Sequence, residues 1–205
     1  MRRPKLAMAL SVGLGLVVSS AAWATNYDEA VNGDLSGDRL NPTILTLTEG
    51  SNLITATSAA GDLEYYRLFV PGGKRLSAIV AVSNTSPSIS FIGVQRGTQF
   101  TESASAPNVA NILGYSHFGV GNGTIGTDIL DNMGVGAGAI GFTPPLGAAN
   151  YTFWSQETGA SATYTLDFQV TAVPNAVPFP RAALALLAVA LAATGFFGMR
   201  RRPAV

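Results

Sequence analysis

Short runs in which hydrophobic and polar residues alternate fill the middle of the chain. Clusters of Gly, Pro, Asn and Ser separate them, and no helical period is sustained. The runs that we interpret as strands are residues 44–48, 52–58, 62–70, 76–83, 88–95, 151–156 and 162–171. Short alternating strands between turn residues are typical of an all-β domain. The pattern therefore predicts an antiparallel β-sandwich over residues 25–173.

The turn residues also predict how some of these strands connect. Residues 71–74 (Pro-Gly-Gly-Lys) follow the strand at 62–70, and residues 157–159 (Glu-Thr-Gly) lie before the last strand. Such short connections between alternating runs favour hairpins, so we expect one hairpin at each position.

The last strand has the most regular pattern. One of its faces carries Tyr164, Leu166, Phe168 and Val170, and the other carries Thr163, Thr165, Asp167, Gln169 and Thr171. Because side chains alternate across a strand, we expect the first face in the core and the second in contact with water.

The N-terminus has the three parts of a secretory signal peptide. Basic residues within positions 2–5 precede the uncharged, mostly apolar stretch 6–18, and Ala22 and Ala24 are the small residues that a cleavage site requires. We expect signal peptidase to cut after Ala24 and remove residues 1–24 as a signal helix. An uncleaved membrane anchor is the alternative.

A second apolar stretch lies near the C-terminus. Residues 182–199 carry no charge and are followed by Arg200, Arg201 and Arg202. At about 1.5 Å per residue, a helix of this length spans roughly 27 Å, close to the thickness of a hydrocarbon core. Arginines favour the cytoplasmic side. The pattern predicts a transmembrane helix with a basic cytoplasmic tail over residues 200–205.

The Pro-rich segment 174–181 joins the sandwich to this helix. It contains the tetrapeptide Val177-Pro178-Phe179-Pro180. Proline fixes φ and disfavours helix at the preceding residue, which holds the tetrapeptide extended. Proteases and transpeptidases bind their substrates in this extended form.

The order of extended Pro motif, short apolar helix and arginine cluster resembles the PEP-CTERM sorting signals of Gram-negative bacteria, in particular the Val-Pro-Leu-Pro-Ala variant. The resemblance covers residues 177–205 and departs from the pattern at Phe179 and Arg181. It implies processing by exosortase, a membrane-embedded cysteine transpeptidase. An inner-membrane intermediate would then precede delivery to the cell surface or matrix. A plain C-terminal anchor is the alternative.

Composition narrows the function further. All 12 acidic residues lie between Asp28 and Asp167, while seven of the 12 basic residues lie near the two ends. An acidic middle excludes nucleic acid as a partner, because binding would need a basic face. The chain has no Cys and one His, which excludes disulfides, thiolate metal sites and sites built from several histidines.

Two stretches are similar to bacterial pre-peptidase C-terminal domains. They are Asp62-Leu-Glu-Tyr-Tyr-Arg-Leu-Phe-Val-Pro-Gly-Gly73 and the closing strands from Pro145 to Trp154 and Tyr164 to Phe168. The resemblance implies a jelly-roll-like sandwich of the kind appended to secreted enzymes and surface proteins. Some of these domains bind calcium, and some assist glycan binding. The Gly-rich residues 98–142 do not match, and we interpret them as an insertion.

Three positions are candidates for chemistry. His117 is the sole histidine and follows Ser116, but a Ser-His dyad needs a third residue to orient the base. We therefore interpret His117 as an ordinary loop or strand residue and predict no catalytic residue. Asp34 and Asp38 lie four residues apart in a Gly-containing loop and are calcium candidates, because Ca²⁺ prefers oxygen ligands on flexible loops. Asp is also common in turns for purely structural reasons, and that alternative stays open.

Trp154 is the candidate glycan contact. Phe153 and Trp154 face opposite sides of one strand, so one ring points away from the core. An exposed ring can stack on a sugar. Alternatively, the insertion covers the second ring and buries both.

Together these features predict an exported, non-catalytic surface or matrix protein without an obligate cofactor. Its partners are signal peptidase, exosortase and exopolysaccharide, as in a biofilm. The alternatives are an envelope hydrolase and a plain membrane-anchored adhesion or glycan-binding module.

Overall fold

The computed structural model describes residues 25–85, 89–157, 159 and 161–174. The first compact unit ends at Ala172, and the unit that follows is described only at Val173 and Pro174. The signal peptide, the Pro-rich tetrapeptide and the apolar stretch 182–199 therefore lie outside the described residues. Within the described part of the chain, no helix is long and apolar enough to cross a membrane.

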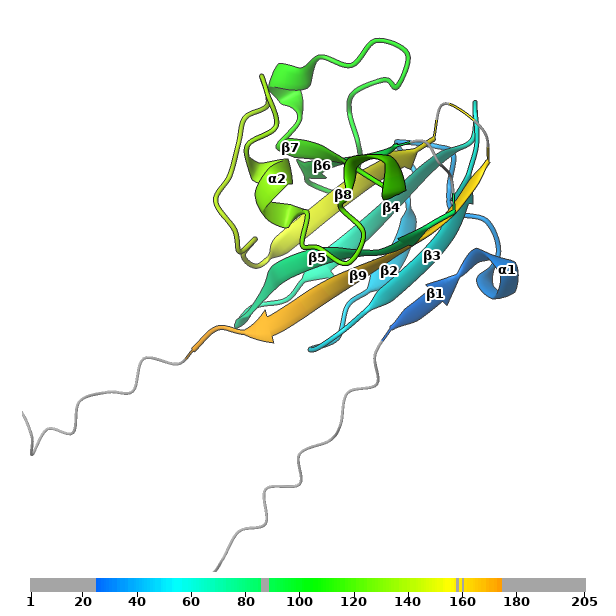
Figure 1. Ribbon diagram of the computed structural model, residues 1–205. Coiled ribbons are helices and arrows are strands. Elements are labelled where there is room, and N and C mark those ends of the chain that lie inside the picture. Colours follow the sequence, from blue (N-terminus) through cyan, green and yellow to red (C-terminus); the bar gives the residue numbers. More distant parts are fainter. Residues whose placement is uncertain (1–24, 86–88, 158, 160, 175–205) are drawn as a thin grey trace, which may run out of the picture. The chain divides into compact units, whose positions relative to one another are not determined.

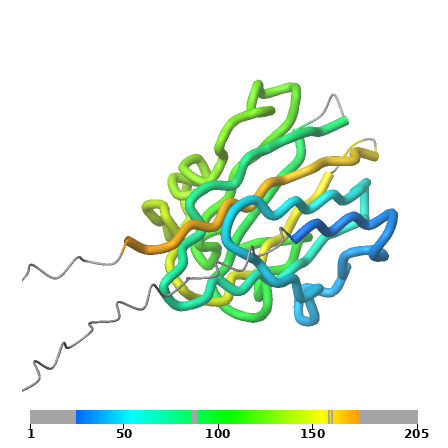
Figure 2. The backbone as a smooth tube through the Cα atoms, turned by 90° about the horizontal axis from the view of Figure 1, so that it is seen from below, coloured from blue at the N-terminus to red at the C-terminus, as the bar shows by residue number. Residues whose placement is uncertain are grey.

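The described chain is built around two β-sheets (Figure 1). The four-stranded sheet has the order β1-β3-β9-β5, which can be followed in Figure 2, and the five-stranded sheet has the order β2-β4-β8-β6-β7. The strands are β1 (Asn26–Asp28), β2 (Thr43–Thr46), β3 (Leu53–Ser58), β4 (Leu63–Val70), β5 (Lys74–Asn84), β6 (Ser90–Arg96), β7 (Gly114–Phe118), β8 (Ala149–Gln156) and β9 (Ala162–Ala172). The predicted all-β sandwich is confirmed at this level. The seven predicted runs correspond to strands β2–β6, β8 and β9.

The main core lies between the two sheets. On β9, Tyr164, Leu166, Phe168 and Val170 are at most 1% exposed, which confirms the predicted inner face. The opposite face departs from expectation at Asp167, which is 8% exposed. Residues 51 and 52 lie over this carboxylate and donate hydrogen bonds to it.

Both predicted hairpins are wrong. β4 lies in the five-stranded sheet and β5 in the four-stranded sheet, so the turn at 71–73 crosses from one sheet to the other. The connection from β8 to β9 crosses in the same way. Turn residues show that the chain reverses direction, but they do not show whether the next strand pairs with the last one or packs against it.

The sheets are mixed and not purely antiparallel as predicted. β1 pairs parallel with β3, and β2 pairs parallel with β4. The chain alternates between the two sheets from β1 to β6. Strands two apart in the sequence therefore share a sheet and run in the same direction.

The residues predicted as an insertion, 98–142, contribute to the fold. They contain the 3₁₀ turns η1 (Val109–Asn111) and η2 (Val120–Asn122), the edge strand β7 and the short helix α2 (Leu130–Gly134). A Cβ atom on Gly114 would lie 2.3 Å from the carbonyl oxygen of Met133, so the close approach of β7 to α2 requires glycine there. The segment also buries Phe100 and Ile112 against Tyr65 and Trp154 on the outer face of the five-stranded sheet.

Both ends of the described chain leave the sandwich at the same end. Asn26 pairs with Leu53, and Leu53 pairs with Asp167 on the antiparallel β9, so β1 starts where β9 finishes. The blue and orange ends in Figure 1 follow this arrangement. The start of β4, at the far end of β3, lies at the opposite end of the sandwich.

Candidate functional site

Three carboxylates converge at this opposite end. Glu29, Asp34 and Glu64 each bring one oxygen to within 4.8 Å of the other two. Glu29 begins the helix α1 (Glu29–Asn32), whose N-cap Asp28 accepts a hydrogen bond from the backbone N–H of Ala30. The cap at Asp28 therefore fixes where α1 begins, and with it the position of Glu29.

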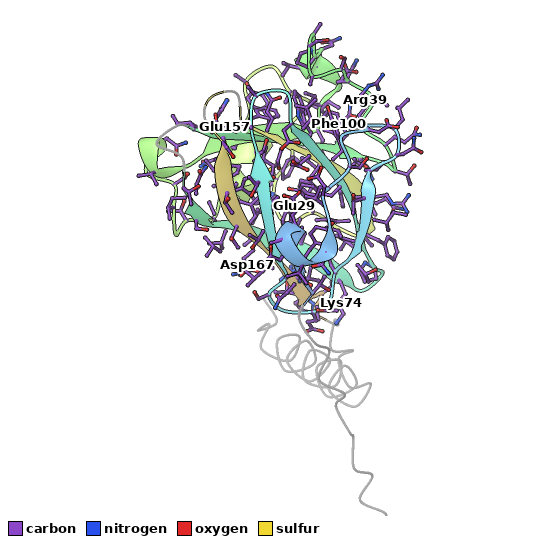
Figure 3. The ribbon with its side chains drawn as sticks, turned by 90° about the vertical axis from the view of Figure 1, so that its right-hand side faces the viewer. Glu29, Arg39, Lys74, Phe100, Glu157 and Asp167 are labelled. Carbon is purple, nitrogen blue, oxygen red and sulfur yellow. The ribbon has the colours of Figure 1, made fainter. Side chains whose placement is uncertain are left out.

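Glu29 is held in place by backbone donors from two segments. Its Oε1 accepts from the N–H of Leu35 at 3.0 Å, and its Oε2 accepts from the N–H of Thr57 on β3 at 2.6 Å. Figure 3 shows Glu29 at the short helix α1. Each oxygen keeps a lone pair, so the carboxylate is oriented and still able to bind a further group.

Glu64 is the least expected member of the cluster. It is 0% exposed, and neither of its carboxylate oxygens accepts a hydrogen bond from any described residue. Burial, together with the negative charges of Glu29, Asp62 and Asp34, raises the pKa of Glu64 to about 9. A buried, ionised carboxylate without donors is strongly unfavourable, so this side chain requires a positive partner or a proton.

The arrangement can satisfy Glu64 in two ways. A proton on Glu64 can be shared with Glu29, whose pKa is also raised by burial. Alternatively, a divalent cation can replace the proton. Ca²⁺ binds oxygens at about 2.3–2.6 Å, so two ligands on one ion lie up to about 5 Å apart, which fits the observed spacing. Carboxylates with water and backbone carbonyls are the ligands that this ion prefers.

The two calcium candidates from the sequence separate in the structure. Asp34 belongs to the cluster. Asp38 is exposed, and it accepts hydrogen bonds from the N–H of Leu40 at 2.9 Å and from Nδ2 of Asn41 at 2.7 Å. The amide of Asn41 and the N–H of Leu40 lower the pKa of Asp38. Asp38 therefore has the contacts of a turn residue.

Sequence reasoning missed Glu29 and Glu64, although a signal for Glu64 was present. Because side chains alternate between the two faces of a strand, Glu64 lies on the same face of the strand at 62–70 as Leu68 and Val70, and that face points into the core. A charged residue on a buried face marks a partner or a function. Glu29 had no comparable signal, because its position depends on the fold of α1 against β3.

The predicted glycan contact needs correction. Trp154 is 2% exposed and packs against Tyr65, Phe91 and Phe100. The segment that contains Phe100 and Ile112 covers it, so the insertion buries the second ring as the alternative interpretation had it. Trp154 presents no ring face at the surface on which a sugar could stack.

His117 lies on the edge strand β7 and is exposed. Its imidazole makes edge-on contacts with the rings of Phe91, at 5.6 Å between centroids, and Tyr115, at 6.3 Å. These aromatic contacts place His117 in a surface cluster of rings. The residues of the sorting motif, the signal cleavage site and the arginine cluster lie outside the described residues.

Comparisons with family models, curated proteins and solved structures find no match to this chain. The geometry and the sequence pattern therefore carry the functional argument.

Proposed function

We propose that this chain is an exported, non-catalytic surface or matrix protein, processed at its tail by exosortase and associated with exopolysaccharide. The sandwich is the working module, of the jelly-roll-like kind found in pre-peptidase C-terminal domains. Signal peptidase releases it after Ala24, and exosortase acts near Val177-Pro178-Phe179-Pro180. The supporting sequence observation is the ordered series of Pro motif, apolar stretch and arginine cluster.

The topology of the sandwich is compatible with this use. β1 starts and β9 finishes at one end of the sandwich, so the opposite end lies away from both of these strand ends. That opposite end carries Glu29, Asp34 and Glu64. The ring of His117 contacts Phe91 and Tyr115.

Mass spectrometry of the two termini of the mature protein tests the sorting proposal. We expect a mature N-terminus at Thr25 and loss of residues 182–205 in cells with exosortase. The full tail should persist in cells without the enzyme. Replacing Pro178 and Pro180 by Ala should block tail processing while membrane insertion continues. Persistence of the tail in wild-type cells would overturn the proposal in favour of an ordinary anchor.

A specific observation supports a second function, the binding of Ca²⁺ at the carboxylate cluster. The observation is Glu64, buried with both oxygens lacking donors among the described residues. Since its pKa is about 9, Glu64 holds a proton at neutral pH, and the cation must displace it. Calcium affinity should therefore increase with pH, about tenfold per unit between pH 6 and pH 8.

Calorimetry of the full chain in two buffers with different ionisation enthalpies tests this function. At pH 7 we expect saturable Ca²⁺ binding with release of about one proton per ion. Binding without proton release would show that the ion binds elsewhere, and no calcium-dependent heat would show that a proton alone satisfies Glu64.

A further inference from the structure

The outer face of the five-stranded sheet carries a row of aromatic residues on three adjacent strands. The register places Trp154 of β8, Gly93 of β6 and Tyr115 of β7 side by side. Gly93 leaves a gap between the two rings, and the ring of Phe91 lies over it, 3.1 Å from where a Cβ atom would be. Phe91 in turn stacks on Tyr115 and contacts Trp154, with centroid distances of 5.9 and 4.6 Å.

The neighbouring row brings polar groups to both sides of Phe91. Gln156 of β8 and His117 of β7 are its cross-strand partners. The side-chain amide of Gln156 is partly exposed and has no hydrogen bond to any described residue. The aromatic centre is therefore flanked by an amide on one side and an imidazole on the other.

A cavity of about 170 Å³ opens above these rows. Its floor includes Phe91, Tyr115, Trp154 and Gln156, and the segment 104–112 forms its wall. No charged side chain lines the cavity. The indole ring of Trp154 forms part of the floor, and its Nε1–H is buried and has no acceptor among the described residues. An unpaired buried donor is costly and marks a place where an acceptor is expected.

We propose that this cavity binds one neutral pyranose ring of a glycan. Aromatic faces pack against the C–H faces of a sugar, while the amide of Gln156, which lines the cavity, can hydrogen-bond its hydroxyls. The absence of charge in the lining favours a neutral sugar over a uronic acid. The inference rests on the proposed function, because it identifies where a polysaccharide-associated module contacts its ligand. This site differs from the contact predicted at Trp154. The ring of Trp154 is buried, and the partly exposed rings of Phe91 and Tyr115 are the ones that a sugar can reach.

Trp154 provides the measurement. The chain has two tryptophans, and in the full chain carrying Trp23→Phe the only indole belongs to the cavity. We expect cellobiose or maltose to change its fluorescence saturably and to shift its indole N–H resonance. Gln156→Leu should weaken binding about fivefold or more, because it removes the amide and keeps the apolar volume. Gln169→Leu, on the outer face of the other sheet, is the matched control and should bind like the parent.

A second probe and a second variant make the outcome decisive. Tyr115→Ala should weaken sugar binding about tenfold, and its melting temperature should be measured to confirm that it is folded. Stronger binding of p-cresol than of either sugar would overturn the proposal in favour of an apolar ligand. Sugar binding as strong in Gln156→Leu and Tyr115→Ala as in the parent, or no response in the parent, would also overturn it. None of these readouts depends on tail processing or calcium, so the inference can fail while the proposed function stands.

Discussion

Asp167 and Glu64 are both buried, in different regions of this protein, and their surroundings differ completely. On the outer face of the four-stranded sheet, Oδ1 of Asp167 accepts hydrogen bonds from Oγ of Ser51 at 2.8 Å and from the N–H of Asn52 at 3.0 Å. Its Oδ2 accepts from Nε2 of Gln169 at 3.1 Å. At the start of β4, neither oxygen of Glu64 has a donor among the described residues.

The difference separates a structural carboxylate from one that awaits a partner. Hydrogen bonds to an ionised group compensate for its burial, so Asp167 joins the 51–52 turn to β9 as part of the fold. Glu64 lies close to Glu29 and Asp34 and gains nothing comparable from the protein. Folding alone gives no reason to keep an acid at this position, whereas binding of a proton or a cation does.

The largest effect on stability is expected when a new carboxylate is introduced into the apolar core. Val170 is buried between the sheets opposite Leu76 of β5. Val170→Asp should reduce the free energy of unfolding by more than about 4 kcal/mol, because it buries an unpaired charge in an apolar core. Chemical denaturation, or loss of soluble folded protein, measures the effect.

The neighbouring residue supplies the control for Val170→Asp. Thr171 is exposed, and its Oγ1 accepts a hydrogen bond from Nε of Arg75. Thr171→Glu should change stability by less than about 0.5 kcal/mol, because the new charge stays in water beside an arginine. If Thr171→Glu unfolds the protein while Val170→Asp stays folded, the assignment of the two faces of β9 is wrong.

A smaller loss of stability is expected when the hydrogen-bonded carboxylate of Asp167 is removed. Asp167→Ala leaves the N–H of the buried Asn52 and the hydroxyl of Ser51 without their acceptor. The variant should lose about 3 kcal/mol of unfolding free energy. Denaturation with and without Ca²⁺ should give the same loss, since Asp167 belongs to the fold and not to the cluster. A loss that appears only with calcium would contradict the structural role.

Glu64→Gln should have an effect on stability whose sign depends on pH and on calcium. A carboxyl with a pKa of about 9 in the folded state, against about 4.3 unfolded, stabilises the folded state fully below pH 4. That contribution is lost by about 1.4 kcal/mol per pH unit as the pH rises toward 9, since the unfolded state ionises first. Without calcium, Glu64→Gln should therefore equal the parent in stability at pH 4 and be more stable than the parent at pH 8, with the difference growing as the pH rises between these values.

Calcium should reverse that order. The parent gains stability from the bound ion, and the variant has lost a ligand, so at pH 8 with excess Ca²⁺ the parent should melt at the higher temperature. Melting curves at two pH values with calcium or a chelator give all four comparisons. A variant that is less stable than the parent without calcium would show that Glu64 is satisfied by the protein itself.

Local pattern predicted most of the strands and the inner face of β9, because alternation is a property of each strand alone. It could not show that β4 and β5 belong to different sheets, since a turn at 71–73 suits a hairpin and a crossing between sheets equally well. The sequence pattern identified one of the three residues of the cluster. Asp34 stood out in its loop, but Glu29 meets it only because its two oxygens bind the N–H groups of Leu35 and Thr57.

The smallest expected effect distinguishes the two aspartates that the sequence could not separate. Asp34→Asn should weaken Ca²⁺ binding clearly, because it removes one charge from the cluster. Asp38→Asn should leave the calcium affinity within about twofold, because Asp38 is engaged with Leu40 and Asn41 and any remaining influence is screened by salt. Asparagine also keeps the side-chain oxygen that accepts from the N–H of Leu40, so the turn should persist. Parallel calcium titrations at pH 8 measure both variants. Equal weakening in the two would place the ion in the loop itself and leave Glu64 with its proton.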